Sequence, residues 1–403
     1  MPSRLRPQGL LLILGFTILL IASSLDVINK YFGVNGMAIY ALLILLTLYF
    51  GSQFVFPAFA SIVTEKWANV LALVTFVVVI AIVIYAYPIA DSGVYGGGSD
   101  ADDALILAAN ALIHGQYPFY PLTYLGNPIA PMPGSVILAV PFVFFALFAL
   151  QNIFWLAVFF CVVRKHLNSS FYGLVLLWLI LIFSPSVFQN LVTATDRVAN
   201  ALYILTAMWF MLKTIPRPAS AVWKKILPTV LLGIGLSSRS NFFFLVPLLF
   251  GILGQNTDWK TATKYLLLAG FVFALVTLPF WIYDPAGFTP LSQQSEKVLR
   301  FEGVLPYARL VVPLSGMFLA IALSFRKMKL DCMVFFENCA IVQLFAVLLL
   351  SAISSIYLGR LDLYFGHVGY GVFFLFFGSF AALIGFKAKN DEIEISRQVS
   401  MAS

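Results

Sequence analysis

Three aspartates stand close together in the most polar stretch of the chain, residues 91–133. Asp100, Asp102 and Asp103 lie there with one further aspartate and without any lysine or arginine. Because neighbouring carboxylates raise one another's pKa, one of them could accept a proton from a bound hydroxyl and act as a general base. The same residues could instead only complement the dipole at the start of a helix. Their spacing alone leaves both interpretations open.

The elements that must position these aspartates are membrane helices. Of the 403 residues, 61% are hydrophobic and 10% are charged, whereas soluble domains are about 45–50% apolar and about 25% charged. This composition excludes a soluble enzyme, a nucleic-acid binder and a secreted disulfide scaffold. The net charge of +7 fits basic residues retained on the cytoplasmic face of a membrane protein. The spacing of the three cysteines favours neither a disulfide nor a zinc site.

Apolar runs between charged breaks predict an all-α polytopic membrane protein with about twelve transmembrane helices. The run 134–163 could be one tilted span kinked near Pro141 or two half-helices, and charge parity favours one span. A polar string at 237–241 divides a second long run into a re-emergent pair. The predicted spans are 9–25, 37–63, 67–90, 134–163, 171–187, 196–213, 225–237, 241–254, 262–283, 305–325, 332–355 and 366–386.

Charge also predicts the orientation in a plasma or inner membrane. With an inside N-terminus, 17 of the 24 lysines and arginines fall on the cytoplasmic side, as the positive-inside rule requires. Both termini are then cytoplasmic, and the acidic stretch is extracytoplasmic. The predicted parts are three transmembrane helices in 1–90, an extracytoplasmic loop in 91–133, the remaining bundle in 134–386 and a flexible cytoplasmic tail in 387–403.

The acidic loop is expected to contain one short helix. Ser99 with Asp102 three positions later forms a capping-box pattern, and Gly115 is a natural helix stop. Apolar positions cover a broad face of this segment, so the helix should lie along the membrane interface or pack onto the ends of the spans. Several prolines between 118 and 133 then impose a stiff, extended return to the next span.

Taken in order, these motifs resemble the type C (GT-C) glycosyltransferase superfamily, and most closely its prokaryotic mannosyltransferase-like branch. In that family an acidic residue or pair in the first large outside loop opens a helix with the pattern Ala-Ala-x-Ala-Leu, followed by glycine and tyrosine. Family members usually have one span before this loop, whereas this chain has three. The matching residues here are Asp102-Asp103, Ala108-Ala109-Asn110-Ala111-Leu112, Gly115 and Tyr117 or Tyr120, with weaker likenesses at 128–141, 184–210, 231–251 and 278–287.

The resemblance implies an inverting glycosyltransferase that moves a hexose, a mannose-like sugar or a pentose from a polyprenyl phosphate to an acceptor hydroxyl outside the cell. The loop aspartate would be the general base, with Asp102 and Asp103 as first candidates and Asp100 in reserve. Negative charge develops on the leaving phosphate, so a cation is needed there, and Arg239 in its polar break is the first candidate. Asn241 could bind phosphate or sugar, or satisfy the backbone freed at the break.

Other residues are weaker candidates for the same substrate. Arg300 and Arg360 are alternative phosphate ligands, because a guanidinium binds two phosphate oxygens at once. Asp196 and Arg197 are expected to pair with each other rather than to contact substrate. The remaining candidates for substrate contact are His114, Tyr117 and Tyr120, although an aromatic belt at the interface explains the tyrosines equally well.

The implied partners are a polyprenyl-phosphate lipid, a glycan or glycolipid acceptor and membrane lipids, with no nucleic acid. The donor lipid is a substrate, no protein metal site is predicted, and a divalent ion remains an open possibility. The main alternative is a multi-span transporter or flippase for a lipid-linked or anionic substrate. A transporter should place charges at mid-membrane, whereas most fall here at span ends. A polysaccharide polymerase or ligase is a third possibility, but it usually carries its large loop late in the chain.

Overall fold

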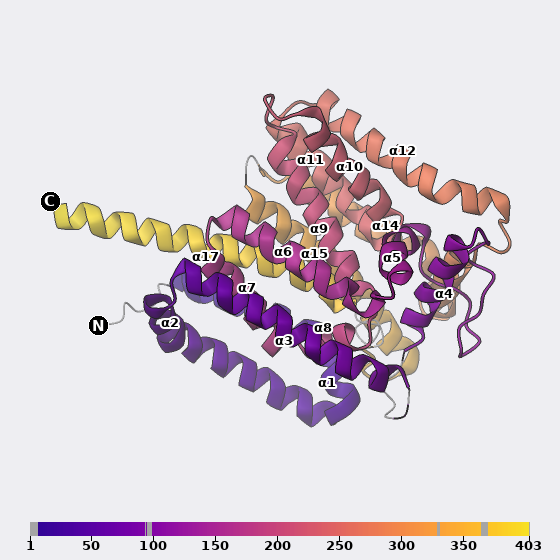
Figure 1. The fold of residues 1–403 in the computed structure, drawn as a ribbon, viewed down its shortest axis with the longest axis horizontal. Helices are drawn as coiled ribbons and strands as arrows, with labels where there is room; N and C mark the ends of the chain where they lie inside the picture. The colour runs from indigo at the N-terminus through magenta and orange to yellow at the C-terminus, as the bar shows by residue number, and fades with distance from the viewer. Residues whose placement is uncertain (1–6, 93, 95–98, 329–330, 364–369, 403) are drawn as a thin grey trace.

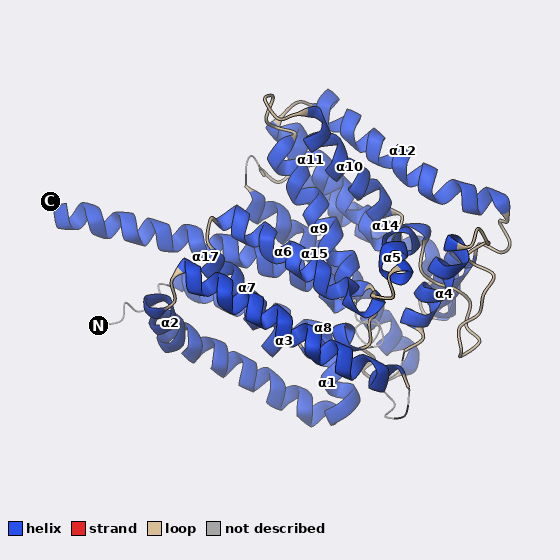
Figure 2. Ribbon diagram, in the orientation of Figure 1, coloured by secondary structure: helices blue, strands red, loops and turns tan. Residues whose placement is uncertain are grey.

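The computed structural model describes residues 7–92, 94, 99–328, 331–363 and 370–402, which form helices joined by short loops (Figure 2). Six of the described helices are long and apolar enough to cross a membrane, or seven if one bent pair counts as a span. An all-helical, membrane-embedded protein is therefore confirmed, while the count of twelve spans and the orientation stay predictions. The six are Ile13–Ile62, Glu65–Asp91, Phe148–Leu167, Trp259–Tyr283, Cys332–Leu358 and Gly371–Lys389.

The first helix, α1 (Pro7–Phe50), is too long for a single crossing. Its 44 residues would extend about 66 Å at 1.5 Å per residue, against about 30 Å of hydrocarbon. Gly33 interrupts it with a φ of 65°, a conformation that glycine adopts without strain because it lacks a Cβ. The start of α1 and the short helix α2 (Phe56–Ile62) lie at the same end of the molecule (Figure 1). The two arms of α1 thus cover the first two predicted spans.

The predicted span 134–163 is two helices. Helix α5 (Pro133–Phe144) ends in a Schellman motif in which Leu147 N donates to Phe142 O at 2.7 Å and Ala146 has a φ of 55°. Helix α6 (Gln151–Leu167) follows a short 3₁₀ turn. The expectation of one continuous span kinked near Pro141 is therefore wrong, because the chain turns after the proline, at a residue in the left-handed region.

A second predicted span, 171–187, is bent sharply near its end. Helix α7 (Ser170–Phe183) and helix α8 (Pro185–Val192) meet at 83°. The sequence between them explains the bend, since Ser184 caps α8 and Pro185 is a favourable first residue of a helix.

The remaining predicted spans coincide with helices within a few residues, except for 366–386, whose first residues lie outside the described residues and whose helix continues past residue 386. The polar break predicted at 237–241 also forms, because a helix ends before it and a 3₁₀ turn, Ser240–Leu245, begins inside it. Helix α17 continues through the predicted tail to Ala402, and the flexibility and cytoplasmic location of that tail stay predictions. The helices are α3 (Glu65–Asp91), α9 (Arg197–Thr214), α10 (Val222–Leu236), α11 (Val246–Asn256), α12 (Trp259–Tyr283), α13 (Thr289–Leu299), α14 (Ala308–Ser324), α15 (Cys332–Leu358) and α17 (Gly371–Ala402).

Helix α9 forms the centre of the main core, and most of its residues are buried. Helix α10 packs against it through Gly235, where an added Cβ would lie 2.6 Å from Ile204. Such close approach at small residues is how membrane helices associate. Helix α4 (Ala101–Ile113) lies at the end of the molecule opposite the chain termini (Figure 1). It packs on α5, and together these two helices cover one end of the bundle.

Candidate functional site

The acidic stretch contains a helix where one is expected, but its start is built differently. Asp100, not Ser99, immediately precedes α4, and its side chain makes no capping bond to the helix. Among the described residues, the Ser99 hydroxyl accepts from Ala101 N, at 3.3 Å, and not from Asp102 N. The predicted capping box between Ser99 and Asp102 is therefore wrong. Gly115 does end the helix, with a φ of 70°.

The three loop aspartates contact different partners. Asp100 accepts from Thr123 Oγ1 at 2.9 Å and from Asn127 Nδ2 at 2.7 Å. Asp103 accepts from the backbone N–H of Tyr124 at 2.9 Å. These two carboxylates thus hold the return segment of the loop against α4.

Asp102 differs, because it turns toward a membrane helix. The hydroxyl of Tyr87 on α3 donates to its Oδ2 at 3.0 Å, and its side chain is 2% exposed. Burial raises the pKa of this carboxyl to about 6, and the Tyr87 bond opposes that shift. Its Oδ1 is buried and has no hydrogen-bond partner among the described residues. A carboxylate with one unused oxygen and a pKa near neutrality is suited to accept a proton.

The predicted sugar-contacting residues attach the loop to the end of α12. Tyr117 donates to Phe280 O at 3.0 Å, and Tyr120 donates to Asp284 Oδ2 at 3.0 Å. His114 is exposed, with its Nδ1 2.8 Å from Asn110 O in the preceding turn. These contacts give the two tyrosines a structural role in fixing the loop.

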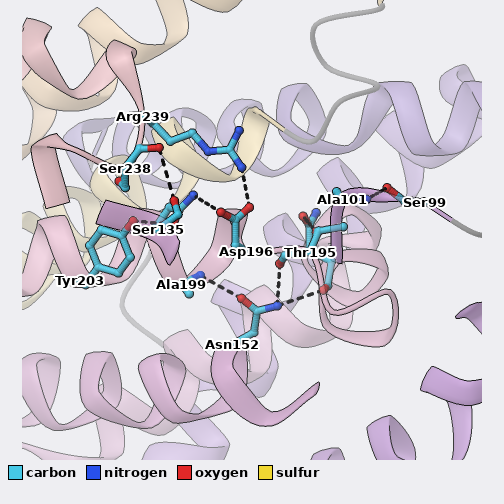
Figure 3. Close-up of polar contacts among 12 residues, drawn as sticks. Ser99, Ala101, Ser135, Asn152, Thr195, Asp196, Ala199, Tyr203, Ser238 and Arg239 are labelled. Carbon is cyan, nitrogen blue, oxygen red and sulfur yellow. Dashed lines mark hydrogen bonds and ion pairs between the residues drawn. The ribbon is translucent and has the colours of Figure 1, made fainter. Parts of the chain in front are cut away.

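Arg239 follows α10 and forms a buried ion pair with Asp196. Its Nη2 lies 2.5 Å from Asp196 Oδ1, and the two side chains are 15% and 2% exposed (Figure 3). The expectation that Asp196 pairs with its neighbour Arg197 is therefore wrong. Successive helical residues point about 100° apart, so a partner from another helix can reach the carboxylate that the adjacent residue cannot.

A polar network surrounds this ion pair and fixes its geometry. Asn200 Nδ2 donates to Asp196 Oδ2 at 2.9 Å, and Tyr203 OH donates to Asn200 Oδ1 at 2.5 Å. Asn152 on α6 accepts from Ala199 N at 2.9 Å and donates to Thr195 O at 2.7 Å (Figure 3). Because both carboxylate oxygens of Asp196 accept hydrogen bonds in this network, the ion pair is held in one arrangement.

Helix α5 connects the loop helix to the Arg239 break. Gly134 N donates to Ser237 O at 2.8 Å. The Ser135 hydroxyl donates to Ser238 O at 3.3 Å (Figure 3). Residue 134 must be glycine at this separation, since an added Cβ would lie 2.0 Å from Ile234 O. On its other side α5 shares an apolar cluster with α4 and with Ala194, two residues before Asp196. The loop and the ion pair are therefore neighbouring regions that share one helix.

The structure does not bring all the predicted phosphate ligands together. Asn241 lies in the same break as Arg239, but its Nδ2 donates to Gln343 Oε1 at 2.6 Å, which ties the break to α15. Arg300 lies over the Phe301 ring, with its guanidinium carbon 4.8 Å from the ring centre, and Arg360 is exposed beyond α15. Among the described residues, no hydrogen bond or ion pair joins Arg239 to the three loop aspartates.

One charged residue near the ion pair was missed by the sequence analysis. Asp26 on α1 is 4% exposed, and Arg197 lies within electrostatic reach of Asp26, Asp196 and Arg239. The sequence did contain a signal for Asp26, which is an ionisable residue in an apolar run. Such a residue is costly to bury in a membrane helix and is usually functional.

Together, the apolar helices and the buried ion pair define a polytopic helical membrane protein. In the described part of the chain, no group of three or more histidines, cysteines and acidic residues is placed to hold a metal ion. The chain matches no protein-family model, no curated protein and no solved structure.

Proposed function

We propose that the protein is a membrane glycosyltransferase that moves a sugar from a polyprenyl phosphate to an acceptor hydroxyl on the extracytoplasmic face. The proposal includes twelve membrane crossings with both termini in the cytoplasm. The observation that carries it is Asp102, a buried carboxylate with a pKa of about 6 and one unused oxygen, on a helix that covers one end of the bundle. Its resemblance to the general base of type C glycosyltransferases supports the same assignment.

In this mechanism the acidic loop acts on the acceptor hydroxyl, and the Arg239 region acts on the phosphate of the donor. Asp102 takes the proton of the acceptor hydroxyl while the acceptor oxygen bonds to the anomeric carbon of the donor. The bond from that carbon to the phosphate oxygen breaks, and its electron pair leaves on the phosphate. Arg239 stabilises the developing charge, since its Nε is buried without a hydrogen-bond partner in the described part of the chain.

The test replaces each loop aspartate separately in the full-length protein, reconstituted in lipid discs. Transfer of radiolabelled mannose from polyprenyl-phosphate mannose to extracted membrane glycolipids is measured, with the glucose and arabinose donors tested in parallel. We expect Asp102→Asn to lower the rate about 10²–10⁴-fold, the usual contribution of a general base. Asp103→Asn is the matched control and should retain most activity, because that side chain accepts a hydrogen bond from the Tyr124 backbone. Equal, full activity in all three variants would remove the assigned base.

A transporter or flippase is the second candidate, and one observation favours it. Asp26 and Arg197 place charged groups inside the bundle, on α1 and at the start of α9, as transporters do. A flipping assay with a fluorescent polyprenyl phosphate in liposomes separates the two functions. Movement of the lipid across the bilayer without any sugar transfer would favour the transporter.

A further inference from the structure

Asp26 is a buried carboxylate that makes no hydrogen bond within the described part of the chain. It is 4% exposed, and both of its carboxylate oxygens lack a hydrogen-bond partner among the described residues. It lies in the first arm of α1, about 10 Å along the helix from the turn at Gly33. A buried carboxylate without hydrogen bonds is costly, so its presence points to an interaction that the protein alone does not make.

The surrounding helices fix the position of Asp26. Two residues earlier, the Ser24 hydroxyl lies 3.2 Å from the Ser184 hydroxyl and binds α1 to the bend between α7 and α8. Two residues correspond to a rotation of about 200° around a helix, so Asp26 faces away from that bend. On a further side, α17 approaches so closely that a Cβ on Gly371 would lie 2.7 Å from Ser23 Cα.

Arg197, which lies within electrostatic reach of Asp26, also has an unused hydrogen-bonding group, and so does Arg239, which lies within reach of Arg197. The Nε atoms of Arg197 and Arg239 are buried without a partner in the described residues. Asp196 is already engaged by Arg239 and Asn200. Asp26 and Arg197 form no ion pair within 4.0 Å among the described side chains. This region therefore holds unused acceptors on Asp26, an unused donor on Arg197 within electrostatic reach of it, and a second unused donor on Arg239.

A ligand that bonds both to the Asp26 carboxylate and to the arginine donors must offer hydroxyl donors and an anionic acceptor on one small group. A free anion would use only the arginines, and a simple cation would use only the carboxylate. A sugar phosphate has both, because its ring hydroxyls donate to carboxylates and its phosphate oxygens accept from guanidinium groups. The buried cluster therefore has the chemistry of a binding site for a sugar phosphate.

We propose that Asp26 binds the sugar of the lipid-linked donor by accepting hydrogen bonds from its hydroxyls, while Arg197 binds the adjacent phosphate. This assignment rests on the proposed glycosyltransferase function and adds a sugar-recognition residue outside the acidic loop. It also gives a role to the N-terminal helix that precedes that loop.

The test measures lipid binding rather than turnover, on the full-length protein in lipid discs. Native mass spectrometry gives the affinity for two probes, polyprenyl-phosphate mannose and the same polyprenyl phosphate without a sugar. We expect Asp26→Asn to weaken binding of the sugar-bearing lipid at least tenfold and to leave binding of the bare lipid phosphate unchanged or tighter. Arg197→Gln should weaken both probes by similar factors, because the phosphate is common to them.

The control on the same helix is Ser24→Ala, which removes a helix contact without changing charge and should affect the two probes equally. Equal loss of both probes in Asp26→Asn would show that Asp26 only supports the fold, and no loss of either would remove it from the site. Deoxymannosyl lipids sharpen the result, since the analogue lacking the recognised hydroxyl should bind the wild type and Asp26→Asn equally.

The outcome is separable from that of the proposed reaction. If sugar-dependent binding falls in Asp26→Asn but no transfer is observed with any donor, the recognition site stands and the transferase assignment fails. If transfer depends on Asp102 while Asp26→Asn binds both lipids like the wild type, the transferase stands and the role given to Asp26 is overturned.

Discussion

The acidic loop and the buried ion pair use aspartates in opposite ways. In the loop, Asp102 receives one hydrogen bond from a phenol, and burial raises its pKa to about 6. At the start of α9, Asp196 is bonded to the Arg239 guanidinium and to the Asn200 amide. A carboxylate that faces a guanidinium is held in its charged form, whereas a buried one without a cation exchanges protons near neutrality. In the proposed reaction, the acidic loop moves a proton and the buried ion pair holds charge.

Two regions with different tasks must still be placed relative to each other, and α5 does this. It contacts α4 through apolar side chains, and the Arg239 break through one backbone hydrogen bond and two bonds of serine hydroxyls. A base and a phosphate ligand placed by one rigid helix keep a fixed separation, which favours a reaction that needs both at once.

The largest expected effect comes from breaking the ion pair. Asp196→Asn leaves the Arg239 guanidinium buried without its charge partner, which typically costs about 3–5 kcal/mol of folding free energy. We expect a clear fall in the thermal unfolding temperature of the purified protein in detergent. The matched control is Arg309→Gln, which breaks the exposed pair between Arg309 and Glu302 and should cost about 0–1 kcal/mol. Equal effects of the two substitutions would contradict the distinction between buried and exposed pairs.

Much of the helical framework could be predicted from the sequence. Apolar runs bounded by charge gave α3, α9 and α12 to within a few residues, and the polar break after α10 was visible in its composition. The bends at Ser184 and 145–147 were not placed correctly, because the chain stays largely apolar through them, whereas the turn at Gly33 lies in the break predicted between the first two spans. Hydropathy measures transfer into lipid and contains little information on where an apolar helix bends.

The candidate site was predictable in its residues but not in its contacts. Asp102 was selected from its place in the loop, while its bond to Tyr87 depends on how α3 and α4 pack. The pairing of Asp196 with Arg239 joins residues 43 positions apart, so the adjacent Arg197 looked the better partner. Asp26 was missed because it stands alone, without neighbours that form a motif.

An intermediate effect is expected where α5 joins the two regions. In Gly134→Ala the new methyl group meets Ile234 O at 2.0 Å, so α5 or α10 must shift. Overpacking of this kind costs about 1–3 kcal/mol, and the shift should also lower transfer activity by separating the base from the phosphate ligand. Gly270→Ala is the control, because nothing lies within 4 Å of a Cβ on that helical glycine. Unchanged stability and activity in Gly134→Ala would show that the two regions do not depend on α5.

The smallest expected effect concerns the proton-accepting region alone and is measured as a pH dependence. As a general base Asp102 works when deprotonated, so kcat/KM should rise with pH through about 6, its pKa in the folded protein. The Tyr87 hydrogen bond favours the charged carboxylate, so Tyr87→Phe should raise that pKa and move the rising limb to higher pH. A hydrogen bond to a charged group is worth about 1.5–3 kcal/mol at most, and one pH unit corresponds to about 1.4 kcal/mol, so we expect a shift of roughly one unit.

Tyr120→Phe provides the matched control for this pH shift. It removes a tyrosine hydrogen bond to a different carboxylate, Asp284, and should leave the limb where it is in the wild type. If the rise of kcat/KM occurs at the wild-type pH in Tyr87→Phe, or moves equally in both variants, the titrating group is not Asp102. The ion pair of Asp196 and Arg239 is unchanged in both variants, so any difference between them arises in the loop region. The pH profile therefore tests the assignment of proton transfer to Asp102 without disturbing the region proposed to bind phosphate.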